Sequence, residues 1–468
     1  MLPQFLDRKY ELKLLEDLYS RTTFKFFILY GRRRVGKTEL LKHFLKGKKG
    51  IYALATDENL RENIRELKTK FYELTKKDYF LKIETDSIYD LFKYLAEEVK
   101  DNVVIIIDEF PYLLNLNKGL LSTFQKIADE LLKDSKIMLI LCGSSLAVME
   151  NDVLGYKSPL YGREMNNFKL MPFNFITVYS AIKDIEKAIE SYFIFGNVPY
   201  YLKFFKIEKD ISSNIRDSFL TKGMNLYDEP LILLRQEFKE SRTYRLILKY
   251  ISLGYTTMGK LCSACGIDKS NIMKYLSTLE ETNIIRHILP FGMKRKGYYE
   301  ITDSFFRFWF RFVYPNKDNL EIGDIVSVEK EIKKEINTFF GKSFEYLIEE
   351  LMKSKLFDEL KEFSNIHKWW HKDKEIDIVA FKGDSKEILL CECKWQEDVE
   401  AEKIIRELNE KAKFLKWNNE NRKEIFSVFA KSFKKRLGSF ENKKVYCYDL
   451  RDIRGLLEKN ISNIFINR

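Results

Sequence analysis

One stretch near the start of the chain restricts the fold more than any other. Residues 26–30 (FFILY) form an apolar, β-prone run, the sequence GRRRVGKT follows at residues 31–38, and a helical pattern begins at residue 39. The glycines let the backbone curl so that its N–H groups face inward, and the start of the helix adds partial positive charge. A loop of this kind between a strand and a helix binds phosphate, which predicts a nucleotide site.

Two side chains of this loop have distinct expected roles. Lys37 reaches the β- and γ-phosphates, and the hydroxyl of Thr38 is a ligand for Mg²⁺. ATP and Mg²⁺ are therefore the expected cofactors. The residues expected to bind the nucleotide are Gly31, Arg32, Arg33, Arg34, Val35, Gly36, Lys37 and Thr38.

The second half of such a site is a buried strand that ends in an acid. Residues 103–107 (VVIII) form a continuous apolar run, which is typical of a strand covered on both faces, and Asp108 and Glu109 follow. We expect Asp108 to hold Mg²⁺ through water and Glu109 to orient and deprotonate the attacking water, so that ATP is hydrolysed. The alternative for Glu109 is an acid that interacts with the dipole of a helix start.

Two further segments offer polar groups to the γ-phosphate. A third apolar run, at residues 137–141, is followed by Ser144 and Ser145, which are candidates for sensing this phosphate or for capping the next helix. Arg163 is a candidate arginine finger or sensor, and the alternative is an ordinary surface arginine.

These motifs together resemble the archaeal ATPase family that is related to AAA+ and STAND proteins. The resemblance implies that the matched loop binds ATP, that the paired acids coordinate Mg²⁺ and activate water, and that a helical lid follows. It leaves monomers and ring-shaped homo-oligomers open. The motifs, which cover about residues 1–230, are FLDRKYEL at 5–12, the loop at 30–38, DEF at 108–110, GSS at 143–145 and YGR at 161–163.

Basic charge gathers in the middle of the chain. The whole sequence holds 81 Lys and Arg against 70 Asp and Glu, or +11, and residues 231–320 alone hold 15 against 8, or +7. Two short helical patterns, at 257–265 and 271–281, are followed there by a strand and by the basic turn Lys294-Arg295-Lys296. This order resembles a winged helix, which predicts DNA as a partner. A protein-binding or intramolecular role is the alternative.

A third constellation lies near the end of the chain. Asp377 is on one expected strand, Glu392 and Lys394 share a face of the next, and Glu345 is on a preceding helix. Such a group can bind Mg²⁺ through Glu345, Asp377 and Glu392 and polarise water for attack on a phosphodiester, with Asp377, Glu392 and Lys394 as catalytic residues. The pattern resembles the PD-(D/E)XK nuclease superfamily, although Ile376 stands where proline is common. The alternative is an exposed, salt-bridged strand face.

The length of 468 residues suggests about three domains, and the predicted fold class is multidomain α/β. We expect a P-loop NTPase domain with a parallel sheet and a helical lid at 1–230, a winged helix-turn-helix at 231–320, and a restriction-endonuclease-like α/β domain at 335–468. No apolar run approaches the ~20 residues of a membrane span, so we expect a cytoplasmic protein without a membrane partner.

The predicted function is that of an ATP hydrolase that acts on DNA, or is regulated by it, through the winged helix and the nuclease-like domain. The sequence leaves cleavage of DNA undecided. The alternative is a non-cleaving switch, in which ATP binding sets the conformation for binding DNA or protein.

Overall fold

A computed structural model describes residues 5–21, 23–162, 165–383, 385–419 and 421–466. The chain divides into two compact units. The first runs to Pro172 and also includes Val198–Tyr200. The second contains Phe173–Asn197 and the chain from Tyr201 onward. Among the described residues, no helix is long and apolar enough to cross a membrane.

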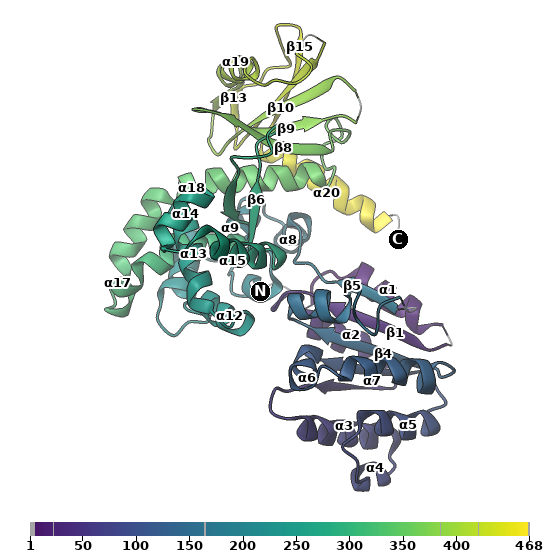
Figure 1. Cartoon of the computed structure of the whole chain (residues 1–468). Helices are drawn as coiled ribbons and strands as arrows, with labels where there is room; N and C mark the ends of the chain where they lie inside the picture. The colour runs from purple at the N-terminus through teal and green to yellow at the C-terminus, as the bar shows by residue number, and fades with distance from the viewer. Residues whose placement is uncertain (1–4, 22, 163–164, 384, 420, 467–468) are drawn as a thin grey trace. The chain divides into compact units, whose positions relative to one another are not determined.

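The first unit is built on a five-stranded parallel sheet, as the alternating strand and helix patterns predict (Figure 1). Its strands pair in the order β2-β3-β4-β1-β5, and each pair is parallel. The strands are β1 (Lys25–Tyr30), β2 (Gly50–Leu54), β3 (Val103–Asp108), β4 (Ile137–Gly143) and β5 (Met165–Lys169).

Helices cover both faces of this sheet, which explains why β3 and β4 are apolar at every position up to their ends. Successive residues of β1 alternate between the faces: Phe27 packs with α1 and α2, whereas Ile28 packs with α3, α5, α6 and α7. The helices are α1 (Lys9–Tyr19), α2 (Lys37–Leu45), α3 (Leu60–Thr75), α4 (Tyr79–Lys82), α5 (Ile88–Glu98), α6 (Phe110–Leu116) and α7 (Leu120–Lys126), and the π-helical segments η1 (Ile127–Leu132) and η2 (Val148–Val153) follow.

The second unit begins with helices. A hairpin of two antiparallel strands follows α14 and α15, which is the order of elements expected for a winged helix. Whether this segment is a winged helix stays a prediction. The helices are α8 (Phe175–Ile182), α9 (Ile185–Ile194), α10 (Pro199–Leu202, whose first two residues belong to the first unit), α11 (Ile211–Ile215), η3 (Arg216–Leu220), α12 (Glu229–Glu237), α13 (Ser241–Ser252), α14 (Met258–Cys265) and α15 (Lys269–Glu281); the hairpin is β6 (Ile285–Ile288) and β7 (Tyr298–Ile301), followed by α16 (Ser304–Phe308), η4 (Trp309–Val313), η5 (Tyr314–Asn316) and α17 (Lys317–Glu321).

A long helix, α18 (Ile325–Lys353), leads to a mixed sheet with the order β14-β15-β12-β10-β9-β8. Strands β8, β9 and β10 form an antiparallel meander, and β12 then pairs parallel to β10 after the helix α19. Helix α19 packs Ile405 and Leu408 against Leu390 and Phe426 of the sheet. The elements are β8 (Asn365–His371), β9 (Lys374–Phe381), β10 (Glu387–Lys394), β11 (Val399–Glu400), α19 (Ala401–Ala412), β12 (Lys423–Ala430), β13 (Phe433–Lys435), β14 (Ser439–Phe440), β15 (Lys443–Tyr448) and α20 (Leu450–Ile466).

Helix α18 starts before residue 335, where the third domain is predicted to begin. Its side chains contact both the preceding helices and the following sheet. Phe340 packs on Phe193 of α9, and Phe340 and Phe344 both pack on Trp395 at the end of β10. The division of the chain into three domains stays a prediction.

Candidate functional site

The loop between β1 and α2 depends on glycine at two points. Gly31 lies against the carbonyl of Leu170, and a Cβ atom at this position would approach that oxygen to 2.4 Å. Gly36 has a left-handed conformation (φ 94°) and caps the start of α2, where another residue would be strained. The backbone of the loop is therefore fixed by close packing at one end and by its dihedral angles at the other.

Lys37 and Thr38 are the last residues of the loop motif and the first residues of α2. The Lys37 ammonium is buried and donates hydrogen bonds to the carbonyls of Gly31 (2.8 Å) and Arg32 (3.0 Å). The Thr38 hydroxyl donates to Asp108 Oδ2 at the end of β3, at 2.7 Å. The structure thus joins the start of α2 to the acid at the carboxyl end of β3, the two elements that sequence analysis paired.

Asp108 is buried and accepts hydrogen bonds from several groups. Tyr52 of the neighbouring strand β2 donates its hydroxyl to Oδ2 (2.6 Å), and the Glu109 backbone N–H donates to Oδ1 (2.8 Å). Burial alone would raise the pKa of Asp108, but hydrogen bonds from Cys142, Tyr52 and Thr38 outweigh it and lower the pKa. Asp108 is therefore anionic at neutral pH and oriented for a cation.

Glu109 sits one residue further, at the start of α6. Its backbone is left-handed (φ 53°), a conformation that costs energy for a residue with a side chain. Ser144, at the end of β4, donates its hydroxyl to Glu109 Oε2 at 2.7 Å, and Arg33 Nη1 lies 3.7 Å from Oε1. Ser144 therefore contacts the second acid, a contact that sequence analysis did not consider.

Two arginines support the loop, Arg8 from outside it and Arg34 from within it. Arg8 is buried and donates to the carbonyls of Val35 (3.0 Å) and Met171 (2.9 Å). The Arg34 guanidinium lies 4.2 Å from the centre of the Tyr200 ring. The candidate Arg163 lies outside the described residues.

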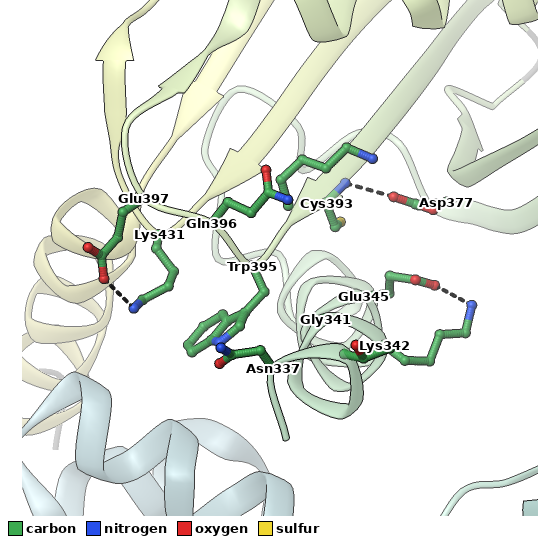
Figure 2. A pocket seen from close by; sticks show the side chains of 12 residues that line it. Asn337, Gly341, Lys342, Glu345, Asp377, Cys393, Trp395, Gln396, Glu397 and Lys431 are labelled. Carbon is green, nitrogen blue, oxygen red and sulfur yellow. Dashed lines mark hydrogen bonds and ion pairs between the residues drawn. The ribbon is translucent and has the colours of Figure 1, made fainter. Parts of the chain in front are cut away.

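The second candidate site faces a cavity of about 920 Å³ between α18 and the carboxyl end of β10. Figure 2 shows that Asp377 and Glu345 lie in this cavity, and Lys394 is also part of its wall. Asp377 Oδ2 accepts a hydrogen bond from the backbone N–H of Cys393 at 2.8 Å. Of the four residues predicted here, Glu392 is not among those that line the cavity.

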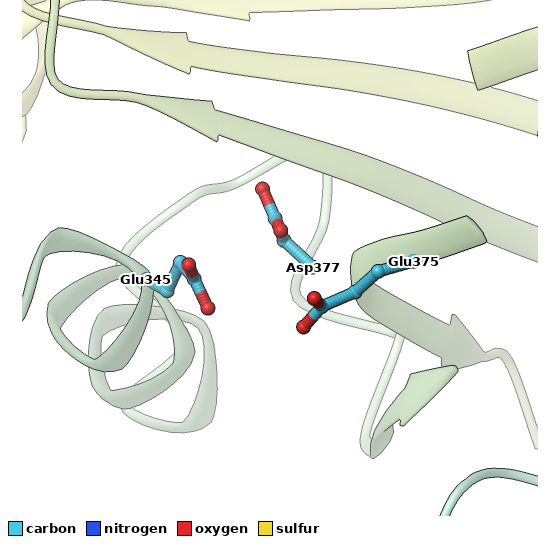
Figure 3. A group of neighbouring side chains, drawn as sticks. All are labelled: Glu345, Glu375 and Asp377. Carbon is cyan, nitrogen blue, oxygen red and sulfur yellow. The ribbon is translucent and has the colours of Figure 1, made fainter. Parts of the chain in front are cut away.

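Glu375 belongs to this acidic group, although sequence analysis did not select it. Carboxylate oxygens of Glu345, Glu375 and Asp377 all lie within 4.8 Å of one another (Figure 3). Glu375 and Asp377 are two apart on β9 and so share a face, a spacing that could have revealed the pair. Burial, together with the negative charges of Glu345 and Glu392, raises the pKa of Asp377.

Lysines already balance the charge of Glu345, of Glu375, which lies 3.6 Å from Lys342, and of the nearby Glu392. Lys342 (2.6 Å) and the buried Lys368 (2.8 Å) pair with Glu345; burial alone would raise the pKa of Glu345, but the two ammonium groups lower it. Glu392 is buried and bridges Lys394 (2.8 Å) and Lys411 (2.5 Å).

The β6–β7 hairpin is connected to this acidic group. The backbone N–H of Phe291, in the turn after β6, donates to the carbonyl of Lys368 on β8 at 2.9 Å. Lys368 in turn binds Glu345. The turn continues into Lys294, Arg295 and Lys296, which are exposed.

Two polar side chains at the start of α15 bind Asp268, the residue that caps this helix. Asp268 accepts hydrogen bonds from the side chains of Ser270 and Asn271, both at 2.6 Å. Lys269 and Lys274 are exposed on the same helix.

Comparison with known proteins connects this geometry to a family. An ATPase domain found predominantly in Archaea matches residues 5–202. The uncharacterized protein MJECL04 of Methanocaldococcus jannaschii is 32% identical over 463 residues, which span 96% of this chain and 99% of the relative. The chain belongs to this archaeal ATPase family.

Further comparisons concern parts of the archaeal ATPase. Residues 309–404 match a family described as "Archaea bacterial proteins of unknown function". A second uncharacterized protein of M. jannaschii, MJ0424, is 50% identical over 93 residues, which cover 20% of this chain and 89% of that protein. The solved structure of the Walker-type ATPase PABY2304 of Pyrococcus abyssi has a TM-score of 0.50 and 24% identity, over 66% of this chain and 96% of that chain. This last likeness shows a shared fold.

Membership in the archaeal ATPase family confirms the resemblance read from the motifs of the first 230 residues. It also supports nucleotide binding and ATP hydrolysis at the general level of the family. The matched ATPase domain extends past Pro172, where the first compact unit ends, into α8, α9 and α10. The roles of single residues, DNA binding and nuclease chemistry stay predictions.

Proposed function

We propose that the protein hydrolyses ATP in an Mg²⁺-dependent reaction at the β1–α2 loop. The observation that carries this proposal is the 2.7 Å hydrogen bond between Thr38 and Asp108, beside the buried Lys37. A hydroxyl and an anionic carboxylate are hard oxygen donors of the kind that Mg²⁺ prefers, so these residues suit the ion. Bound Mg²⁺ would neutralise charge that develops on the phosphates.

The other residues of the site supply positioning and proton transfer. The backbone N–H groups of the loop and Lys37 hold the phosphates. Glu109, which accepts a hydrogen bond from Ser144 at 2.7 Å, would orient the attacking water and take its proton.

ATP turnover by purified protein tests this proposal. We expect Lys37→Ala to abolish nucleotide binding, and Glu109→Gln to retain binding while losing most turnover. Lys13→Ala, an exposed lysine of α1, is the matched control and should turn over ATP like wild type. Full ATP affinity in Lys37→Ala would contradict the assignment of the loop.

We further propose that DNA binds through α15 and the turn of the β6–β7 hairpin. The exposed Lys294, Arg295 and Lys296 support this, because clustered cations bind phosphates. We expect DNA to change the rate of ATP turnover, and replacement of the three residues by glutamine to weaken DNA binding and to lower its dependence on salt. The same replacement at Lys434 and Lys435, two exposed lysines of β13, is the control and should leave DNA binding close to that of wild type.

A second candidate function is cleavage of DNA at the carboxylate group in the cavity. The three converging acids favour it, since Glu345, Glu375 and Asp377 offer the oxygen ligands of a divalent cation. Such a cation would polarise a water molecule for attack on a phosphodiester. The antiparallel meander followed by a crossover helix and a parallel strand is compatible with the nuclease-like fold that the motif resemblance implies.

Plasmid cleavage in Mg²⁺ separates the nuclease from a non-cleaving switch. A nuclease should lose cleavage on Asp377→Asn and on Lys394→Ala, while ATP turnover without DNA continues. If wild type and both variants leave intact both the plasmid and a linear DNA with a single-stranded overhang, the switch is the better account of the second unit.

A further inference from the structure

The cavity beside the carboxylate group is larger than a metal site needs. Its volume of about 920 Å³ lies in the range of pockets that hold organic ligands. One wall is α18, and the other is formed by Asp377 of β9, the last residues of β10 and the residues that follow β10 and β12 (Figure 2). Glu345 and Asp377 occupy only one part of the lining.

The wall formed by α18 contains a glycine that packing does not explain. Gly341 lies inside this 29-residue helix, where glycine is less stable than alanine. A Cβ atom at Gly341 would meet nothing within 4 Å. The effect of the glycine is therefore to leave the helix surface free of a side chain where it borders the cavity.

The segment after β10 contributes an aromatic ring that packs against α18. Trp395 is partly exposed, and its ring lies 5.3 Å from that of Phe344 and 5.7 Å from that of Phe340. The Lys431 ammonium lies 5.3 Å from the centre of the indole ring. These neighbours fix the ring before any ligand arrives.

The polar groups of the cavity are those that recognise a nucleotide. The amide side chains of Asn337 and Gln396 can pair with the edge of a base. Lys394 and Lys431 form ion pairs with Glu392 (2.8 Å) and Glu397 (2.5 Å), and they are the cations that a phosphate in the cavity would meet. A base within a duplex is stacked on both faces, so only an unpaired nucleotide could lie against Trp395.

We propose that this cavity binds an unpaired nucleotide of a DNA strand, with its base stacked on Trp395 in the space that Gly341 leaves open. The backbone of the strand then leads to the carboxylate group. This inference rests on the proposed function in one respect, namely that DNA is the partner. It adds the substrate class: DNA with a single-stranded end or gap, rather than an intact duplex.

Fluorescence anisotropy tests the proposal without any turnover. A labelled duplex with a single-stranded overhang is compared with a blunt duplex of the same paired sequence, with Ca²⁺ in place of Mg²⁺. Wild type should prefer the overhang. Because one stacked base accounts for about a 5- to 150-fold change in affinity, Trp395→Leu should lose about that much for the overhang and little for the blunt duplex.

Gly341→Met places a side chain in the part of the cavity next to Gly341 and keeps Trp395 with its aromatic neighbours, so it separates lost binding from lost folding. It should lose the overhang preference while its thermal unfolding midpoint stays at or above that of wild type. Gly455→Met in α20 is the matched control, because Gly455 also lies in a helix and a Cβ there meets nothing within 4 Å. The control should bind like wild type.

Two results would overturn the proposal, and each has its own meaning. If Gly341→Met and Trp395→Leu keep the overhang preference of wild type, the cavity does not hold the nucleotide, although DNA binding stands. If wild type binds neither DNA, the DNA part of the proposed function is also lost. ATP turnover by wild type, measured without DNA, reports on the loop site separately.

Discussion

The hydroxyl of Tyr52 offers a sharp test of how the structure prepares Asp108. Tyr52 and Thr38 both donate to the same oxygen, Asp108 Oδ2, at 2.6 and 2.7 Å. If Thr38 binds Mg²⁺ as proposed, the Tyr52 hydroxyl would still hold this oxygen. Tyr52→Phe therefore removes one hydrogen bond to a buried carboxylate and leaves the size of the side chain nearly unchanged.

The magnitude follows from the charge and the burial of the pair. A hydrogen bond to a charged group contributes about 1.5–3 kcal/mol. Tyr52 is partly exposed, so we expect the lower end, a loss of about 1.5 kcal/mol in the free energy of unfolding at pH 7. The pKa of Asp108 is lowered in the folded state, so its stabilising effect is present above the pKa of the unfolded chain and is lost as pH falls through the folded value. The loss of stability caused by Tyr52→Phe should likewise become smaller as pH falls.

Urea unfolding at several pH values measures this loss, and an Mg²⁺ titration of ATP turnover shows whether the site also binds the ion more weakly. Tyr89→Phe is the control, because Tyr89 also donates to a carboxylate, that of Glu130, but on the exposed surface. A double-mutant cycle with Asp108→Asn isolates the pair. If Tyr52→Phe matches the control in stability, or if the cycle shows no coupling, the reasoning is refuted.

Three further outcomes are expected. Ser144→Ala should lower kcat by about tenfold or more with little change in ATP affinity, because it releases Glu109 rather than the nucleotide; an equal loss in affinity would contradict this. Lys368→Met should raise the affinity of the cavity for Mn²⁺ by about tenfold in calorimetry, because a buried cation no longer competes for Glu345; weaker binding would argue against a cation site there. Since burial and neighbouring acids raise the pKa of Asp377, cation binding should release a proton and strengthen as pH rises through that pKa, which calorimetry in buffers of different ionisation enthalpy would detect.

Local sequence patterns were sufficient for the loop site, and the reason is physical. A phosphate-binding loop needs glycine at set positions, and a strand buried on both faces must be apolar at nearly every residue. Gly31 and Gly36 meet the first need within one short loop, and the apolar run that ends in Asp108 meets the second within one strand. Strands β1 and β3 belong to the same parallel sheet, so their carboxyl ends lie at one edge of it. Thr38, at the start of the helix that follows β1, can therefore meet Asp108 at the end of β3.

Contacts between distant segments were not accessible in this way. Tyr52 meets Asp108 only because β2 lies next to β3, and Lys368 of β8 meets Glu345 only because the sheet that contains β8 packs on α18 through β9 and β10. The sequence around Tyr52 and around Lys368 contains no pattern that predicts either contact. Glu375 lies between these two cases. Its spacing from Asp377 can be read in the sequence, but its approach to Glu345 cannot.

The sequence by itself determined the phosphate loop, its acidic strand and the presence of a carboxylate–lysine group, because each is a short pattern with a local physical cause. The tertiary structure decided which acids converge. It places Glu375 with Glu345 and Asp377, and it holds Glu392 between Lys394 and Lys411. The physical reason is that alternation along one strand fixes the face of a side chain, whereas its partners depend on strand order and on the helix packed against that face.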